Sequence, residues 1–287
     1  MRAVITSVML LVSASSAFAN TPFTSLATAS DGRLGLAAIN TNTIINYHAT
    51  ERFPMTSTFK FILVAAILKH SMADVSFLQK NVRYTKTNIA LAGYGPITEQ
   101  HLATGMTIAQ LCQAAITHSD NAAANLLMQQ LGGPKAVTAF ARSIGDTSFR
   151  LDRWEPQLNS AIPGDVRDTT TPMAMAIDLQ RLVLGHTILG LAQRTQLILW
   201  LQGNTTGATK IRAAVPHGWT VGDKTGHGAY GTTNDIGIIW PPHCAPIVVA
   251  IYVTQINIAT QKQDIIIAQA THRVLQQLMQ TNHCIKK

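Results

Sequence analysis

The stretch Ser57-Thr58-Phe59-Lys60, continued by the apolar run Phe61-Ile62-Leu63-Val64-Ala65-Ala66-Ile67-Leu68, decides how this sequence folds. A lysine stands at each end of the run, which is much shorter than the roughly 20 apolar residues that a membrane-spanning helix needs. We therefore predict a helix over residues 57–68 that is buried in the core of a soluble protein. Helical spacing of three places Ser57 and Lys60 on one face, where the lysine amine can take the hydroxyl proton.

At the amino end of that helix, Ser57 would be surrounded by backbone N–H groups that have no partner within the helix. These groups and the positive end of the helix dipole stabilise a developing oxyanion, which suits a serine nucleophile. An S-x-x-K tetrad alone is weak evidence, because a serine at this place also serves as an ordinary helix N-cap.

Two more short motifs follow, Ser119-Asp120-Asn121 and Lys224-Thr225-Gly226. The first lies just beyond a helix predicted over residues 107–117, where it can present a hydroxyl and an amide to a cleft. The second ends a strand predicted over residues 221–224, where an ammonium and a hydroxyl can bind a carboxylate and the glycine admits a close backbone. Each motif alone fits an N-cap or an ordinary edge strand, but the three together favour a serine acyl-transfer site.

The amino terminus predicts export. Arg2 precedes the apolar residues 3–12 and small residues that end in Ala17-Phe18-Ala19, which is the pattern of a signal peptide cleaved after Ala19. A membrane anchor would need a longer apolar core. We therefore assign residues 1–19 to a signal peptide and expect a secreted, periplasmic protein.

Composition and charge predict a globular protein without a nucleic-acid partner. Hydrophobic residues make up 47% of the chain, enough for a substantial core. The formal net charge is +8, or +7 (8 − 1) once Arg2 leaves with the signal peptide. Because Lys and Arg are scattered, we favour solubility over attraction of anionic ligands as the meaning of this charge. We expect a monomer that has no contact with the membrane after cleavage.

Hydrophobic periodicity predicts strands at both ends of the chain and helices between them. The predicted strands cover residues 33–40, 44–47, 221–224, 235–240 and 247–254, and further predicted helices cover residues 122–131, 134–144, 172–184 and 263–279. We expect residues 20–49 and 202–287 to form one α/β domain and residues 50–201 an all-helical one. The interface between the two is the natural place for a cleft.

Three cysteines stand in a chain sent to a compartment where disulfides persist. The strand over residues 247–254 and the helix over residues 263–279 both extend roughly 30 Å. If the helix returns along the strand, its end lies beside the turn that precedes the strand, and we predict a disulfide between Cys244 and Cys284. Cys112 then remains as a buried free thiol.

The three motifs resemble the S-x-x-K, S-D-N and K-T-G signature of class A β-lactamases and penicillin-binding proteins. The segment Arg153-Trp154-Glu155-Pro156-Gln157-Leu158-Asn159, within residues 150–168, resembles the omega loop of the class A enzymes. A penicillin-binding transpeptidase would lack this segment. The resemblance covers the whole mature chain. It implies the α/β fold of serine β-lactamases and DD-peptidases: a five-stranded antiparallel sheet flanked by helices, an all-helical domain, and the active site at their interface.

The resemblance also implies the reaction, which is hydrolysis of penicillins and cephalosporins through an acyl-enzyme that confers β-lactam resistance. Ser57 would attack the β-lactam carbonyl, with Lys60, or Glu155 acting through a water, as the base for this step. Ser119 would pass a proton to the departing nitrogen. Glu155 and Asn159 would then hold the water that hydrolyses the acyl-enzyme.

Further positions match structural and binding residues of the family. Arg153 and Asp168 match the ion pair that closes the omega loop, and the bond between Glu155 and Pro156 matches a cis peptide. Substrate contacts are implied for Lys224 and Thr225 on the carboxylate, Gly226 beside the substrate backbone, the N–H of Ser57 and of His227 on the oxyanion, Asn121 on the acylamide and Tyr94 at the entrance.

The chain departs from the family near the substrate carboxylate, where neither usual place holds an arginine. We predict that Lys210 takes that role. His227 is unusual for its position, and its side chain either contacts the substrate or faces solvent. Thr56 stands where carbapenem-hydrolysing members often carry a cysteine, so we predict weak or no carbapenem hydrolysis.

Residues 204–208, 223–226 and 230–236 resemble the extended-spectrum cefotaximase branch of class A most closely. A D-Ala-D-Ala peptidase, a penicillin-binding protein and a non-hydrolytic β-lactam sensor are the alternatives. We expect no cofactor and no metal, because the histidines lack ligand spacing and the G-x-G-x-x-G at residues 226–231 opens no helix.

Overall fold

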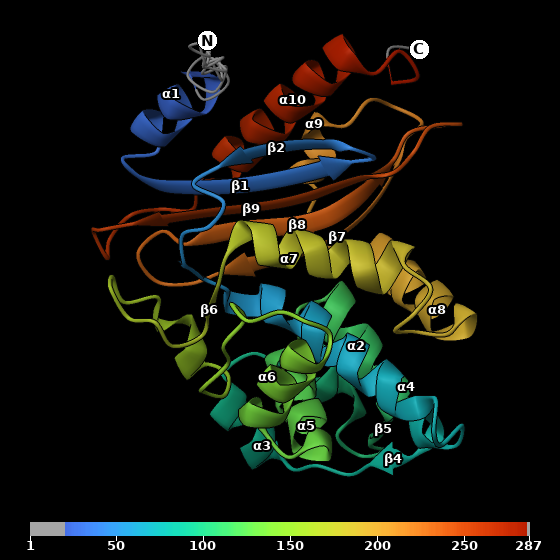
Figure 1. Ribbon diagram of the computed structural model, residues 1–287. Coiled ribbons are helices and arrows are strands. Elements are labelled where there is room, and N and C mark those ends of the chain that lie inside the picture. Colours follow the sequence, from blue (N-terminus) through green and yellow to red (C-terminus); the bar gives the residue numbers. More distant parts are fainter. Residues whose placement is uncertain (1–20, 286–287) are drawn as a thin grey trace, which may run out of the picture.

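The computed structural model describes residues 21–285, in which one five-stranded antiparallel sheet lies between two layers of helices (Figure 1). Its strand order is β2-β1-β9-β8-β7, so strands from both ends of the chain meet in its centre. The strands are β1 (Gly32–Asn40), β2 (Thr43–Tyr47), β7 (Thr220–His227), β8 (Thr233–Trp240) and β9 (Ile247–Gln255). The predicted α/β fold with its antiparallel sheet is confirmed.

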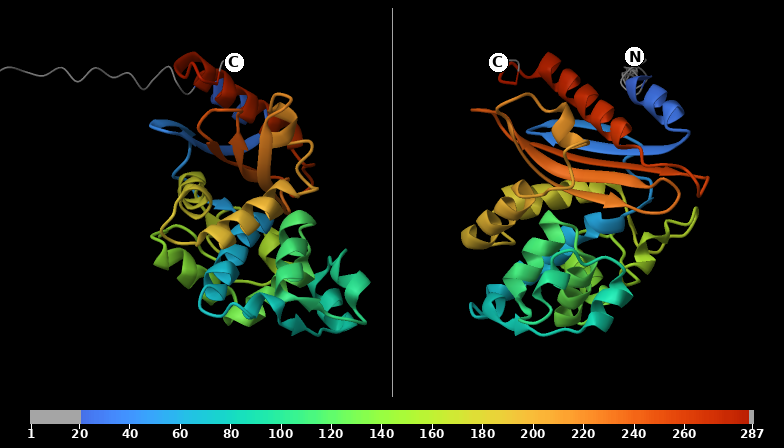
Figure 2. Two further views of the ribbon diagram at one scale, coloured as in Figure 1. Left: turned by 90° about the vertical axis from the view of Figure 1, so that its right-hand side faces the viewer. Right: turned by 180° about the vertical axis from the view of Figure 1, so that it is seen from behind.

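The outer face of the sheet is covered by α1 (Thr21–Ala29) and α10 (Asp264–Thr281) (Figure 1, Figure 2). Every residue of the central strand β9 is buried, because β1 and β8 flank it and helices cover both faces. The smaller of two hydrophobic cores in the described chain lies between these helices and the outer face of the sheet. Helix α1, which was not predicted from the sequence, is anchored in this smaller core through Phe23 and Leu26.

The larger core lies on the opposite side of the sheet, where α7 (Pro172–Leu179) packs on the strands and continues as a π-helical segment (Gln180–Leu184). Helix α2 (Phe59–Ser71) crosses the middle of the helical body and is apolar and buried on almost all sides, as predicted. It begins two residues later than expected, because Thr56–Thr58 form a separate 3₁₀ turn.

The other predicted helices are also present, with ends that differ from the prediction by a few residues. The remaining helices are α3 (Lys86–Ala92), α4 (Ile108–Thr117), α5 (Asn121–Leu131), α6 (Pro134–Ser143), α8 (Leu191–Gln202) and α9 (Ile211–Ala214). Short strands pair as β3 (Phe53–Pro54) with β6 (Thr169–Thr170) and as β4 (Asn81–Val82) with β5 (Met106–Thr107). Single 3₁₀ turns cover Phe77–Gln79, Thr98–His101 and Gln157–Ser160.

The cysteines are arranged as predicted. Cys244 and Cys284 form a disulfide with a Cα–Cα distance of 5.8 Å, which ties the end of α10 to the turn between β8 and β9. Cys112 is a free thiol, and burial raises its pKa.

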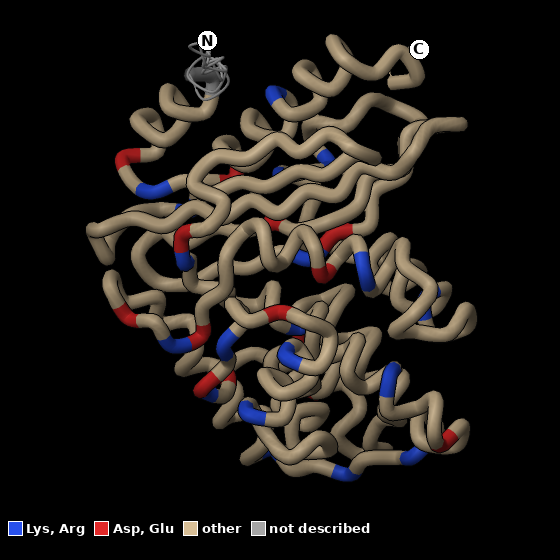
Figure 3. The backbone as a smooth tube through the Cα atoms, viewed as in Figure 1, with Lys and Arg blue, Asp and Glu red and all other residues tan. Residues whose placement is uncertain are grey.

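Charged residues of both signs are interspersed along the described chain (Figure 3). Within residues 21–285, no helix combines the length and the apolar composition that crossing a membrane requires. The predicted signal peptide, residues 1–19, lies outside the described residues.

Candidate active site

Ser57 and Lys60 meet at the junction of the 3₁₀ turn and α2. Lys60 Nζ lies 2.9 Å from Ser57 Oγ, as the spacing of three predicts. Thr56, just before the serine, has a left-handed backbone with φ of 46°. Asn234 of β8 holds this turn, since its Nδ2 donates to Pro54 O at 2.8 Å and to Met55 O at 3.1 Å.

The Lys60 amine is fully buried among oxygen atoms. Besides Ser57 Oγ, it lies 2.8 Å from Ser119 O, 2.6 Å from Asn121 Oδ1 and 3.0 Å from Glu155 Oε1. Burial lowers the pKa of Lys60, and the neighbouring Glu155 carboxylate opposes this shift. The amine therefore sits where a proton can pass between the serine hydroxyl and the glutamate carboxylate.

Glu155 reaches this point from the loop that the sequence identified. Its Oε1 lies 3.5 Å from Ser57 Oγ, and Asn159 Nδ2 donates to its Oε2 at 2.5 Å. The bond between Glu155 and Pro156 is cis, as expected. Asn125 of α5, which sequence reasoning missed, fixes the loop by accepting from Glu155 N at 3.0 Å and donating to Glu155 O at 2.9 Å.

The base of the loop is closed by the predicted ion pair. Arg153 Nε donates to the buried carboxylate of Asp168 at 2.5 Å. The other oxygen of Asp168 accepts the N–H groups of Asp152 and Arg153 at 2.8 and 3.0 Å. These bonds tie the start of the loop to its end, so the position of Glu155 depends on them.

Ser119 and Lys224 face each other across the cleft. Lys224 Nζ lies 3.0 Å from Ser119 Oγ and 2.8 Å from Thr225 O. Burial, followed by the positive charge of Lys60, lowers the pKa of Lys224 to about 7. Ser119 has a left-handed backbone with φ of 57°, and the next residue, Asp120, caps α5 by accepting from Ala123 N at 2.8 Å.

Strand β7 passes close to Ser57, and Gly226 makes this approach possible. A Cβ at this position would lie 2.2 Å from Thr56 Oγ1, 3.0 Å from Met55 O and 3.2 Å from Ser57 N. A residue larger than glycine would push the strand away from the turn. The end of β7, at Gly226, therefore lies close to the backbone of Ser57.

These residues open onto a cleft of about 490 Å³. It is lined by Ser57, Tyr94, His118, Ser119, Asn121, Asn159, Thr206, Thr209, Lys210, Thr225, Gly226, His227, Lys262 and Asp264. Every site residue predicted from the sequence either lines this cleft or contacts a residue that does, apart from the disulfide and the pair at the base of the loop.

One end of the cleft holds the predicted Lys210 in an arrangement that the sequence did not reveal. The buried Lys210 Nζ lies 3.0 Å from Asp264 Oδ2, at the start of α10. His227 Nε2 is 3.5 Å from the other oxygen of Asp264. Burial and the charges of Lys210 and Lys262 lower the pKa of His227 to about 4, so its ring is neutral near pH 7. The side chain of His227 is 28% exposed and lies against Asp264 at the cleft wall.

Thr206 is a second residue that sequence reasoning left without a role. Its Oγ1 lies 2.5 Å from Thr225 Oγ1, and it is held by Asn204, whose Oδ1 accepts from Thr206 N at 3.1 Å. The two hydroxyls form one polar rim next to Lys210. Such a group of hydroxyls and ammonium groups suits a carboxylate.

The sequence model of the β-lactamase enzyme family matches residues 20–278. The chain is 54% identical over 244 residues to β-lactamase CTX-M-97 of Escherichia coli, which is 84% of this chain and 83% of that one. It is 50% identical over 260 residues to the carbapenem-hydrolysing β-lactamase KPC of Klebsiella oxytoca, covering 90% and 88% of the two chains. A solved β-lactamase structure from Desulfarculus baarsii DSM 2075 has a TM-score of 0.89 at 49% identity, over 93% of this chain and 99% of that one.

A serine next to a buried lysine, with a carboxylate on a separate loop, defines a serine hydrolase that acts through an acyl-enzyme. The fold and the similarity along nearly the whole chain narrow this class further. The chain belongs to the β-lactamase enzyme family, and it is a class A β-lactamase.

Proposed function

We propose that the chain hydrolyses penicillins and cephalosporins through an acyl-enzyme on Ser57. The observation that carries this proposal is the position of the Lys60 amine, 2.9 Å from Ser57 Oγ and 3.0 Å from Glu155 Oε1. Two bases thus have access to one serine hydroxyl. Either Lys60 directly, or Glu155 through a water, takes the proton as Ser57 attacks the lactam carbonyl.

In the same proposal, the N–H groups of Ser57 and His227 stabilise the negative charge on the carbonyl oxygen. The carbon–nitrogen bond of the ring then breaks, and Ser119 delivers a proton to the nitrogen. Its hydroxyl lies between two lysines, at 3.0 Å from Lys224 Nζ and 3.5 Å from Lys60 Nζ, which supports this relay.

Deacylation is proposed to use Glu155 and Asn159. Glu155 takes a proton from a water that attacks the acyl carbonyl, and Ser57 leaves with a proton returned through Lys60. The hydrogen bond from Asn159 to Glu155 holds the carboxylate in place for this step.

Recognition of the substrate is proposed to lie along β7. Lys224, Thr225 and Lys210 bind the substrate carboxylate, and Gly226 lets β7 lie against the substrate. Asn121 contacts the acylamide group and Tyr94, 51% exposed, forms one wall of the entrance. Residues 204–208, 223–226 and 230–236 support a place in the cefotaximase branch, whereas overall identity does not separate the branches, since it is 54% both to CTX-M-97 and to the OXY-1 β-lactamase of Klebsiella oxytoca.

The test of this proposal is burst kinetics with a chromogenic cephalosporin. The wild-type protein should open many equivalents, whereas Glu155→Ala should give one rapid equivalent and then stop, because the acyl-enzyme accumulates. Glu99→Ala, which removes an exposed carboxylate, should behave like the wild type. One equivalent in both the wild type and Glu155→Ala would mean a penicillin-binding protein or a sensor instead.

Carbapenem turnover is proposed to be weak, because Thr56 provides no thiol beside the nucleophile. Overall sequence identity does not show whether this chain hydrolyses carbapenems, since the carbapenem-hydrolysing KPC is 50% identical to it. Steady-state kinetics with imipenem should give a kcat/KM far below that for a penicillin. Efficient turnover of imipenem would contradict this expectation.

We also propose that the mature protein acts as a monomer in the periplasm. The apolar segment and Ala17-Phe18-Ala19 at the amino terminus support export. Light scattering of the purified protein tests the monomer, and fractionation of the producing cells tests the location.

A further inference from the structure

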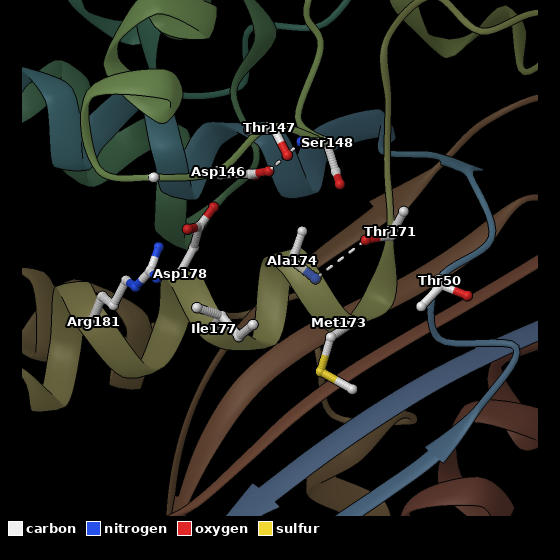
Figure 4. Close-up of a pocket in the computed structure, with 11 residues that line it drawn as sticks. Thr50, Asp146, Thr147, Ser148, Thr171, Met173, Ala174, Ile177, Asp178 and Arg181 are labelled. Atoms are coloured by element: carbon white, nitrogen blue, oxygen red, sulfur yellow. Dashed lines mark hydrogen bonds between the residues drawn. The ribbon is translucent and has the colours of Figure 1, made fainter.

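A pair of acids that the reaction does not use lies between α7 and the segment after α6 (Figure 4). Asp178 of α7 and Asp146 of that segment line a cavity of about 250 Å³. Figure 4 shows the Asp178 carboxyl pointing toward Asp146. Asp178 is fully buried, and Asp146 is only 4% exposed. Two acids are thus held together away from bulk water.

Three oxygens of this pair, both from Asp178 and Oδ2 from Asp146, are buried without a hydrogen-bond donor in the described part of the chain. Ionised carboxylates only accept hydrogen bonds, so two of them cannot satisfy each other. Two adjacent negative charges also repel strongly in a protein interior. One proton on the pair removes both problems, because the protonated acid donates to its neighbour.

The other charged and titratable groups around the pair are committed elsewhere. The neighbouring guanidinium groups donate to backbone carbonyls: Arg181 to Ile144 O at 2.7 Å, Arg142 to Asp146 O at 2.5 Å and Arg52 to Ser148 O at 2.8 Å. The hydroxyl of Tyr252, on β9, lies 3.2 Å from Thr58 Oγ1. Burial, followed by the negative charge of Asp146, raises the pKa of Asp178 to about 9, although the charge of Arg181 opposes this.

We propose that Asp146 and Asp178 share one proton in the folded protein, and that this bond fastens together the two segments that flank the loop carrying Glu155. Asp146 Oδ1 accepts the N–H groups of Ser148 and Phe149 at 2.6 and 3.0 Å, immediately before the loop. Asp178 lies in α7, which starts just after the loop. The acid pair thus joins the segment that enters the loop to the helix that leaves it.

The pair makes the stability of the fold depend on pH. The pKa of Asp178 is raised in the folded chain, so the folded state holds one more proton than the unfolded state between about pH 4 and pH 9. The stability from this proton is fully present below the unfolded pKa and is lost as the pH rises through this window. The unfolding equilibrium constant should therefore increase by up to about tenfold per pH unit, and the increase should level off above about pH 9.

The test is urea unfolding of the wild type, Asp178→Asn and the exposed control Asp31→Asn at several pH values between 5 and 9. The amide of Asp178→Asn has the same shape and donates to Asp146 at every pH. We expect this variant to be as stable as the wild type near pH 5. As the pH rises, its unfolding equilibrium constant should fall below that of the wild type by up to about tenfold for each pH unit. Asp31→Asn should follow the wild type. A pH slope that Asp178→Asn leaves unchanged would overturn the proposal.

Two further measurements keep the test decisive if Asp178→Asn folds poorly. Asp146→Asn leaves Asp178 buried but replaces the neighbouring negative charge by an amide donor, so the pH slope of this variant should be smaller than that of the wild type. Infrared spectra of the wild type at pH 7 should contain the band of a buried protonated carboxyl, and the wild-type spectrum minus that of Asp146→Asn should show this band change, because the partner of Asp178 has changed. Absence of that band from the wild type would overturn the proposal. Stabilisation of the wild type by calcium chloride at pH 8 and constant ionic strength would overturn it as well, because a cation would then take the place of the proton.

Discussion

The two ends of the cleft hold a buried lysine in different ways. Lys60, at the end proposed for the reaction, is surrounded by oxygen atoms of Ser57, of the Ser119-Asp120-Asn121 motif and of Glu155. Lys210, at the recognition end, has one carboxylate partner, Asp264, whose side chain is 30% exposed. The amine of Lys60 is enclosed and has four oxygen partners within 3.0 Å, whereas Lys210 depends mainly on its ion pair with the partly exposed Asp264. Substitutions around Lys60 are therefore expected to lower the rate of the reaction strongly, and substitutions around Lys210 to change substrate binding only modestly.

The largest effect is expected from Lys60→Ala at the reaction end. Where Lys60 is the base for acylation, loss of the amine removes proton transfer from Ser57, and kcat/KM should fall by about 10²- to 10⁴-fold. Pre-steady-state acylation by a chromogenic cephalosporin measures this directly. Lys69→Ala, an exposed lysine on the same helix, is the matched control and should retain full acylation. A loss below tenfold would assign the acylation step to Glu155 and its water.

A change of pH is expected to have an intermediate effect on KM. Lys224 contacts Ser119 on one side and, in the proposed function, the substrate carboxylate on the other. Its pKa of about 7 in the free enzyme means that the ammonium loses its proton as the pH rises through neutrality. In the proposed role of Lys224 the substrate carboxylate binds its charged form, so KM should rise above pH 7 by up to about tenfold per pH unit. Lys224→Arg stays charged throughout and should give a flatter KM profile between pH 6 and pH 9. A flat profile for the wild type would contradict the proposed role of Lys224.

The smallest effect is expected at the recognition end. Lys210→Ala removes one positive charge and leaves Asp264 to repel the substrate carboxylate, so KM for a penicillin should rise roughly fivefold to tenfold, for about 1 kcal/mol of lost binding. The double variant Lys210→Ala with Asp264→Asn removes that repulsion and should recover part of the affinity. An unchanged KM in Lys210→Ala would exclude it from carboxylate binding, while kcat should change little in either variant.

The residues around Lys60 could be predicted from the sequence, whereas the partner of Lys210 could not. Ser57, Lys60, Ser119 and Lys224 lie in short motifs whose spacing carries the chemistry, and the structure brings all of them together. Asp264 was not predicted, because it lies 54 residues from its partner Lys210 in the sequence and neither residue stands in a recognisable motif. Thr206 and Asn125 act through a hydroxyl or an amide, side chains that are common on any loop or helix and carry no pattern.

The fold shows a similar division. The strands and the long helices follow from hydrophobic periodicity, and the disulfide follows from the equal lengths of β9 and α10. The start of α2 was wrong by two residues, because the 3₁₀ turn of Thr56–Thr58 depends on Asn234, which binds it from a distant strand. Helix α1 was missed because its stability comes from contacts of Phe23 and Leu26 with the rest of the core rather than from a pattern of its own.

The left-handed backbones of Thr56 and Ser119 set a limit on how far this enzyme can be stabilised without harm. Each non-glycine residue in that conformation costs on the order of 1–3 kcal/mol. Glycine at either position would relieve the cost, yet Thr56 directly precedes the proposed nucleophile, Ser57, and Ser119 carries the hydroxyl between the two lysines. Selection for heat resistance alone would therefore favour replacements at these two positions, and selection for catalysis would remove them. At these two positions of the active centre, a gain in thermal stability is therefore expected to cost catalytic activity.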